Sequence, residues 1–278
     1  MSLLAQGALV IGGAAVVSVA LLRVARRSPL NERFASEVVE HSKAFDFMGT
    51  AFAVLLAFVV IQAYTSYNDA KTGAETEAEA ILQMSRTVEA FAPQQHGRLE
   101  GLLVCYGRAV IHHGWPTMKE DESGSPVVTE WGTRFREEAV RVGINSSIQR
   151  ESFRQLLEEQ DLRIEGRRTR LAEAIRTVPL PMWLTLLLGA TLTVGWVILG
   201  ARREGSFLVQ AAVVGSVAAM VASALLLVWF LDHPFAGESG SIKPIEMEHT
   251  LETIEEEEAD QAVEITPPCT PAGDALEA

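Results

Sequence analysis

Apolar residues are concentrated in four long runs along the chain. They extend over Leu3 to Leu22, Phe47 to Tyr64, Leu180 to Gly200 and Phe207 to Leu231. Each run is long enough to cross a bilayer, because about 20 helical residues at about 1.5 Å rise per residue cover the roughly 30 Å hydrocarbon core. No Asp, Glu, Lys, Arg or His interrupts any of them. The pattern predicts four transmembrane helices in two hairpins.

The region between the second and third runs is charged and has helical periodicity. Apolar residues recur at helical spacing beyond Tyr64 until Pro93, which predicts that the second span continues into water as one helix. Further helical patterns cover about residues 94–113 and 128–142, with Gly and Pro residues between 114 and 126 marking a loop. We find no strand-like alternation. The expected fold is an all-α membrane protein with a helical extramembrane bundle between spans two and three.

The last helix of this region begins at the capping box Ser146-x-x-Gln149 and continues toward Pro179. It carries the apolar residues Phe153, Leu156, Leu157, Ile164, Leu171 and Ile175.

These patterns divide the chain into four parts. They are a first transmembrane hairpin (1–64, spans about 3–22 and 45–64), a helical extramembrane domain (65–178), a second hairpin (179–231, spans about 180–200 and 207–231) and an acidic tail (232–278). The tail has 13 acidic side chains and one basic side chain, so it carries most of the net charge of −13. Few large apolar residues accompany these charges, so burial cannot offset the entropy of ordering. We expect residues 245–278 to be disordered.

The sequence offers no catalytic or metal-binding constellation. It lacks a phosphate-binding glycine loop, a nucleophile elbow and an HExxH motif. His112 and His113 are adjacent and project about 100° apart on a helix, unlike the i, i+4 pairs of metal sites. Cys105 and Cys269 lie far apart in the sequence and indicate neither a disulfide framework nor a zinc site. We expect no enzymatic activity, metal or cofactor, and no nucleic-acid partner.

The spans also lack ionisable side chains, which proton-coupled transporters need at membrane depth. This absence argues against an active transporter and leaves a passive pore possible. Thr50, Val54 and Phe58 follow i, i+4, i+8 spacing on one face of the second span. If several subunits placed this face around a common axis, the side chains would form narrow rings that exclude water. Contact of Val54 and Phe58 with lipid or a neighbouring helix explains the same spacing.

Small residues at four-residue intervals mark close contacts between transmembrane helices. The last span has such a stripe at Ala211, Gly215, Ala219 and Ser223, and the third span has a shorter one at Thr185, Gly189 and Thr193. The five-residue link 201–205 makes these two spans a tight antiparallel hairpin. The stripes fit either packing within one chain or contact between subunits.

Basic residues in the short links predict the membrane orientation. The link between the first two spans carries Arg23, Arg26, Arg27, Arg33 and Lys43, and the link between the last two carries Arg202 and Arg203. The basic residues follow the first span rather than precede it, which predicts a retained anchor. Counting them places both links in the cytoplasm and the large domain, with both termini, outside. Five basic residues between positions 163 and 176 favour the opposite orientation.

Two motifs resemble those of a known family. The stretch from Gly49 to Val60, continuing through Tyr67 to Glu79-Ala80, resembles the signature of the bacterial bestrophin-like domain family, long classed as a domain of unknown function. The segment from Asp232 to Gly237 resembles the end of that family's last span. The family-motif residues are Trp115, Pro116, Asp232, Pro234, Phe235 and Gly237. The resemblance covers about residues 40–245.

Bestrophins proper are pentameric anion channels whose second span lines a narrow apolar neck. The resemblance therefore implies a homo-oligomer, pentameric by analogy, in the lipid bilayer of a bacterial plasma membrane. It also places Thr50, Val54 and Phe58 at the neck positions. Thr50 departs from the apolar pattern, and Ala236 separates Pro-Phe from Gly. Bestrophins keep their large domain in the cytosol, whereas the basic links here favour the outside.

A second class of function fits the same organisation. In a membrane-anchored sensor or scaffold, the helical domain and the acidic tail would bind partners, and the spans would only hold them at the membrane. This alternative predicts no conductance from the full chain.

Overall fold

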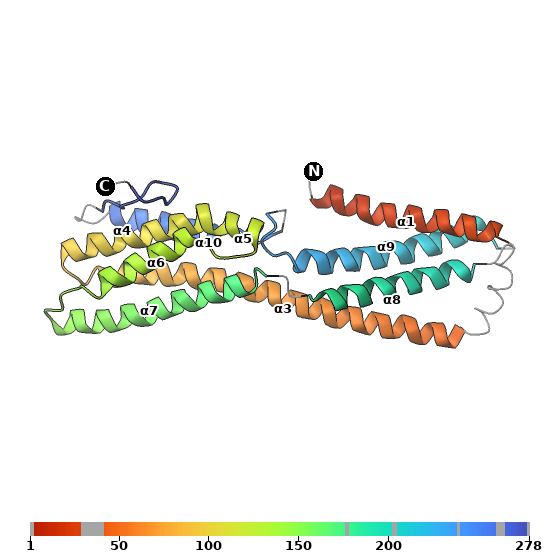
Figure 1. Ribbon diagram of the computed structural model, residues 1–278, viewed down its shortest axis with the longest axis horizontal. Coiled ribbons are helices and arrows are strands. Elements are labelled where there is room, and N and C mark those ends of the chain that lie inside the picture. The colour runs from red at the N-terminus through yellow and green to blue at the C-terminus, as the bar shows by residue number, and fades with distance from the viewer. Residues whose placement is uncertain are drawn as a thin grey trace. The chain divides into compact units, whose positions relative to one another are not determined.

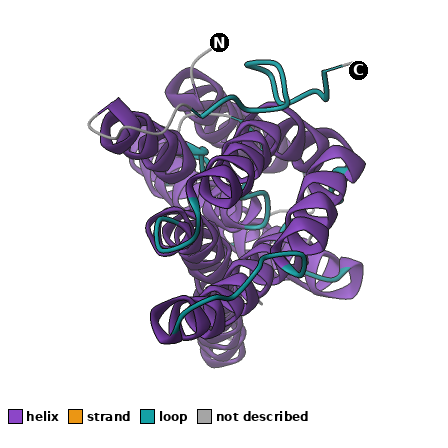
Figure 2. Cartoon of the chain, turned by 90° about the vertical axis from the view of Figure 1, so that its left-hand side faces the viewer, coloured by secondary structure: helices purple, strands orange, loops and turns teal. Residues whose placement is uncertain are grey.

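The computed structural model describes residues 3–28, 42–175, 178–201, 205–237, 240–259 and 265–276. Within these ranges the elements are helices, shown in Figures 1 and 2, and the only β pairing is an isolated bridge between Cys269 and Ala275. The chain forms two compact units: Met1–Ser66 with Arg176–His233, here the membrane unit, and Tyr67–Ile175 with Pro234–Ala278, here the helical unit. The prediction of an all-α fold is confirmed.

Each of the four long apolar runs forms a helix, and two of these helices extend beyond the predicted limits. α1 is Leu3–Arg27, α3 is Ser42–Val88, α8 is Leu180–Leu199 and α9 is Phe207–Leu231. All four are long and apolar enough to cross a membrane. In the membrane unit α1 packs along α9, and α8 contacts both. The prediction of four membrane-spanning helices is confirmed.

The second span continues as one uninterrupted helix, as predicted, and α3 reaches Val88 over 47 residues. Beyond Ser66 its buried side follows helical spacing. That side is formed by Ala70, Ala74, Glu77, Ile81, Met84 and Val88. α3 therefore contributes a core face to the helical unit.

Five more helices and one π turn complete the helical unit. They are α4 (Pro93–Ala109), the π turn η1 (Val110–Gly114), α5 (Trp115–Asp121), α6 (Pro126–Ala139), α7 (Ser147–Ala172) and α10 (Ile245–Ala259). Large side chains such as Tyr106, Trp131 and Phe135 fill the core. The loop predicted between 114 and 126 is wrong for its first half, because Pro116 begins a helix rather than a turn.

α7 starts as predicted, and only part of its apolar pattern is buried. Ser146 caps the helix by accepting a hydrogen bond from the Gln149 N–H at 3.1 Å. Leu156 is buried, and Phe153 and Leu171 pack against the core clusters, whereas Leu157, Ile164 and Ile175 are exposed. The buried residues are Leu156, Glu159, Gln160, Arg163, Gly166 and Arg170. α7 therefore packs through glycine and charged side chains as well as through apolar ones.

Glycine is required where α7 crosses α3. A Cβ at Gly166 would lie 2.6 Å from the Glu77 nitrogen, and a Cβ at Gly73 would lie 2.7 Å from the Arg170 nitrogen. Both clashes are with backbone atoms, which cannot rotate away. The two backbones touch at this crossing, and only glycine allows so close an approach.

The predicted disorder of residues 245–278 is wrong for the described part of this segment. Ile245–Ala259 forms α10, whose Met247, Leu251 and Ile254 are buried in the core of the helical unit. The Thr250 hydroxyl also donates to the Ala78 carbonyl at 3.3 Å. These apolar residues recur at helical spacing among the glutamates, so they share one face of α10. Packing of that face against the core offsets the entropy lost when the segment becomes ordered.

Cys105 and Cys269 are joined by a disulfide, with their Cα atoms 5.8 Å apart. This corrects the expectation that the two cysteines indicate no disulfide. The bond closes a sequence separation of 164 residues and holds the C-terminal segment against α4. Nearby, the Trp131 indole donates to the Gly273 carbonyl at 2.7 Å, and Gly273 has a φ of +86° against the Ala109 backbone. The pairing depends on docking of this segment, which spacing in the sequence does not reveal.

Candidate functional site

Thr50, Val54 and Phe58 lie on an exposed side of α3 in the membrane unit. The exposed fractions of Val54 and Phe58 are 52% and 68%, and Thr50 is also exposed. The Thr50 hydroxyl donates to the Asp46 carbonyl one turn earlier at 2.8 Å, which satisfies it within its own helix. Phe52 and Val59, by contrast, are buried. The three candidates therefore share the side of α3 that its own chain does not cover.

The inner side of α3 meets α8 at Gly189. The Phe52 ring occupies the place where a Cβ at Gly189 would project. A mostly apolar cavity of about 260 Å³ lies beside this contact, and its walls include Thr185, Thr193 and Trp196. The small-residue stripe of the third span is thus the surface that receives α3.

The small-residue stripe of α9 lies partly at its contact with α1. A Cβ at Gly215 would be 3.6 Å from the Val19 side chain, and Ala211 packs against the cluster that contains Leu22. Ala219 is half-buried, and Ser223 is exposed with its hydroxyl donating to the Met220 carbonyl. The first part of the stripe therefore packs within one chain, and Ser223 does not.

Asp232 anchors the end of α9 within the membrane unit. Its carboxylate accepts hydrogen bonds from the Val178 N–H at 2.9 Å and from the Trp183 indole at 3.3 Å. Asp232 is 2% exposed, and these donors satisfy a charge that burial would otherwise disfavour. The carboxylate thus ties the start of α8 to the end of α9.

The other motif residues form a cluster in the helical unit. The Trp115 ring meets Phe235 edge to face at a centroid distance of 5.9 Å, and its indole donates to the Ile242 carbonyl at 3.1 Å. The Pro234 carbonyl accepts from the Ile242 N–H at 2.8 Å. Gly237 has a φ of +78°, and a Cβ there would crowd Lys119. These contacts hold the described residues 234–237 and Ile242 within the helical unit.

Sequence reasoning missed a buried ion pair between α3 and α7. The Arg170 Nε donates to Glu77 Oε2 at 2.6 Å, and the Tyr106 hydroxyl donates to Glu77 Oε1 at 2.5 Å. Burial raises the pKa of Tyr106 to about 12, so the hydroxyl remains a donor. Arg170 also stacks over the Trp115 ring at 4.7 Å. One signal was available, because Glu77 occupies a core position in the apolar repeat of α3.

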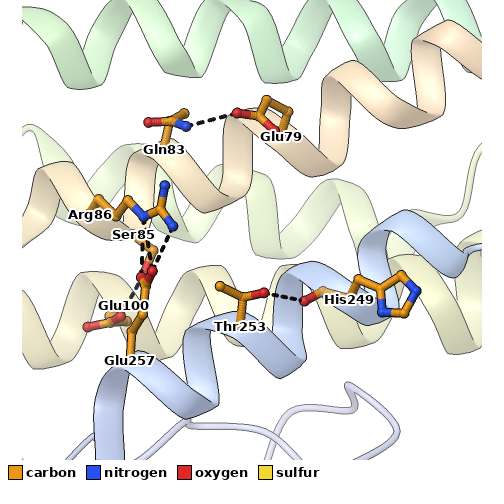
Figure 3. A network of polar contacts seen from close by, with 8 residues as sticks. All are labelled: Glu79, Gln83, Ser85, Arg86, Glu100, His249, Thr253 and Glu257. Carbon is orange, nitrogen blue, oxygen red and sulfur yellow. Dashed lines mark hydrogen bonds and ion pairs between the residues drawn. The ribbon is translucent and has the colours of Figure 1, made fainter. Parts of the chain in front are cut away.

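A second polar network holds α10 against α3 and α4 (Figure 3). Arg86 forms an ion pair with Glu257 at 2.7 Å, and the Ser85 hydroxyl donates to Glu100 at 2.6 Å. Glu100 also pairs with His96, and both are buried. The hydrogen bond that the His96 imidazole donates to the Glu100 carboxylate raises the pKa of His96. Burial, together with the charges of Glu100 and Glu255, raises the pKa of Glu258 on α10 to about 7.

These shifts predict that α10 docks more firmly in acid. The pKa of Glu258 is above its ordinary value of 4.5, so the docked state holds a proton that is lost as the pH rises through about 7. The raised pKa of His96 has the same sign and stabilises the fold below pH 6.5, but its main cause is Glu100 on the same helix, and the charge of Glu258 is what links it to α10. We expect α10 amides to exchange hydrogen more slowly at pH 6 than at pH 8, after correction for intrinsic rates.

Glu258→Gln should reduce this pH dependence, whereas Glu256→Gln, at an exposed position of the same helix, should retain it. Equal protection at both pH values in the unmodified protein would contradict the assignment.

Comparison with known proteins identifies the family. The family model of the bestrophin-like domain matches residues 8–244. One point mutant of a bestrophin homologue from Klebsiella pneumoniae has a TM-score of 0.73 at 16% identity, covering 94% of this chain and 99% of the homologue. A second point mutant of that homologue has a TM-score of 0.72 at 16% identity, with 90% and 99% coverage. No curated protein matches the sequence. Together, the match over most of the chain and the shared fold confirm the resemblance first seen in the motifs: the chain belongs to the bestrophin-like domain family.

Proposed function

We propose that the protein is a passive, oligomeric ion channel whose pore is lined by α3. Family membership and the four membrane-spanning helices support a channel-like membrane protein rather than an enzyme. The assignment of the pore to α3 is carried by the exposure of Val54 and Phe58 on a helix whose opposite side is buried. In a ring of subunits this side would form stacked apolar constrictions.

The resemblance to bestrophins proper supports anions as the permeant ions and five subunits around the pore. It also supports the bacterial plasma membrane as the location. The exposed Ser223 on α9 is available for contact between subunits.

Truncating the neck should increase ion flux. Phe58→Ala and Val54→Ala would widen an apolar constriction and lower the cost of wetting it. A fall of about 1 kcal/mol in the barrier corresponds to about a fivefold rise in flux. The measurement is ion efflux from liposomes that contain purified protein of verified oligomeric state.

Met220→Ala provides the matched control, since Met220 is an exposed apolar residue of α9 outside the proposed neck. Vesicles that stay silent with a well-folded oligomer would count against a channel and favour the sensor or scaffold. Unchanged flux in both neck variants would exclude this side of α3 from the pore.

We further propose that the helical unit faces the outside of the cell. The disulfide between Cys105 and Cys269 supports this orientation, because disulfides persist in oxidising compartments and are rare in the cytosol. The basic links between the spans support it independently. This orientation is opposite to the cytosolic placement that the resemblance to bestrophins implies.

A further inference from the structure

A cavity of about 280 Å³ lies at the end of the membrane unit where α1 ends and α9 begins. Its described wall consists of Arg23, Arg26 and Arg27 from the end of α1 and of Phe207, the first residue of α9. α1 packs along α9 (Figure 1), and this end of their contact brings three guanidinium groups to one place. The electrostatic potential of the cavity therefore favours an anion.

The start of α9 and the residue before its N-cap hold two of these arginines in place. The guanidinium carbons of Arg23 and Arg26 lie 5.9 and 5.6 Å from the Phe207 ring centroid, within the range of cation–π contacts. The Arg26 Nη2 also donates to the Gly205 carbonyl at 3.0 Å. Because these side chains are already positioned, less side-chain entropy is lost when a ligand binds.

The positive charge of the cavity is not balanced by the described part of the chain. Arg23 and Arg27 are exposed, and neither forms an ion pair with another described residue. The last carbonyls of α1 supply only about half a negative charge, against three full positive charges. The Ser206 side chain forms no capping hydrogen bond, so the first N–H groups of α9 add to the positive potential. A bound anion would offset the repulsion among the three guanidinium groups.

The bland explanation is that these arginines only set the orientation of the spans. Short cytoplasmic links favour Lys and Arg. That preference accounts for Lys43, which is exposed near the start of α3 and is absent from the described wall of the cavity. It depends on the number of basic residues, and it does not require three of them to converge beside an aromatic ring.

The position of the cavity indicates the kind of anion. Gly7–Arg27 and Phe207–Leu231 are each long and apolar enough to cross a membrane. The end that they share therefore lies where the hydrocarbon core meets the lipid headgroups. Basic pockets between transmembrane helices bind the phosphate groups of anionic lipids, and arginine matches phosphate through two parallel N–H donors.

We propose that this cavity binds the phosphate group of an anionic phospholipid, with Arg23 and Arg27 donating to it beside Arg26. The site is distinct from the neck on α3, and its occupation does not require the protein to conduct ions.

Native mass spectrometry of the full chain in detergent tests the site, with phosphatidylglycerol, phosphatidylcholine and inorganic phosphate as the probes. We expect saturable binding of phosphatidylglycerol and weaker binding of phosphatidylcholine, whose headgroup has no net charge. The double variant Arg23→Gln with Arg27→Gln should weaken phosphatidylglycerol binding about tenfold. Lys43→Gln is the matched control, because it removes one basic charge from the same link outside the cavity, and it should leave the affinity unchanged.

Inorganic phosphate should not displace phosphatidylglycerol at equal concentration, because it has no acyl chains to lie along the spans. Displacement would assign the cavity to a soluble anion and overturn the proposal. So would the absence of saturable lipid binding, equal affinity for phosphatidylcholine, or equal weakening by Lys43→Gln and by the double variant.

Thermal unfolding of each variant checks that it is folded. Arg23 and Arg27 are both exposed, so the single variants Arg23→Gln and Arg27→Gln decide the matter if the double variant does not fold. Lipid binding is counted without a measurement of ion flux, so the failure of this proposal is separable from the failure of the proposed channel.

Discussion

Replacing Glu77 by alanine is expected to destabilise the helical unit by about 3–5 kcal/mol, because the change leaves the Arg170 charge buried without its partner. The side chains of Glu77 and Arg170 are both 1% exposed, and Glu77 also accepts a hydrogen bond from the Tyr106 hydroxyl. The measurement is denaturant or thermal unfolding of the full chain in detergent, followed through tryptophan fluorescence. A loss of less than about 1 kcal/mol in the free energy of unfolding, which is typical of exposed ion pairs, would contradict the assignment of Glu77 and Arg170 as a buried ion pair.

The double variant Glu77→Met with Arg170→Met distinguishes the cost of leaving a buried charge unpaired from the cost of altering these two positions. Removing both charges avoids an unpaired buried ion, so it should cost much less than either single alanine change. Glu75→Ala is the exposed control, because Glu75 lies two residues earlier on α3 and pairs with Lys71 near the surface. Its expected cost is within about 1 kcal/mol.

Removing the disulfide is the second large perturbation. Cys105→Ser with Cys269→Ser should destabilise the helical unit by about 2–5 kcal/mol, because the bond closes a long segment of chain. Hydrogen exchange should rise first in α10 and in residues 265–276, which the bond holds to α4. A reducing agent should lower the unfolding midpoint of the unmodified protein and leave the double variant unchanged.

The same bond reports on orientation. If the helical unit faces an oxidising compartment, alkylation of free thiols during rapid denaturation of the cells should leave Cys105 and Cys269 unmodified unless the protein is reduced first. Alkylation of both residues in well-folded, membrane-inserted protein would contradict the proposed orientation. Cys105 itself is 0% exposed, so direct surface labelling is unsuitable.

The membrane part of the fold is predictable because its determinants are local. A run of about twenty apolar residues indicates a helix surrounded by the lipid hydrocarbon, and it can be recognised without knowledge of tertiary contacts. The continuation of α3 beyond Tyr64 also follows from uninterrupted periodicity. The motif near Asp232 identifies the family, although its hydrogen bonds to Val178 and Trp183 require the structure.

The helical unit is less predictable because its packing depends on partners distant in sequence. In the sequence, Arg163 and Arg170 look like solvated charges on α7, yet both are buried. Arg170 pairs with Glu77, and the Arg163 guanidinium lies over the Tyr106 ring. α10 has the composition of a disordered tail, and only a core that accepts Leu251 and Ile254 makes it a helix. The exposure of the candidate neck is visible in one chain, whereas its role depends on neighbours that a single chain does not contain.

The glycine contact between α3 and α7 limits how the helical unit can move. With no side chain between the backbones at Gly73 and Gly166, neither helix can slide along the other without collision, and rotation about the contact point is the least obstructed motion. A displacement of this part of α3 along α7 would therefore be transmitted to α7, because the atoms in contact belong mainly to the backbone and cannot rotate away as a side chain can.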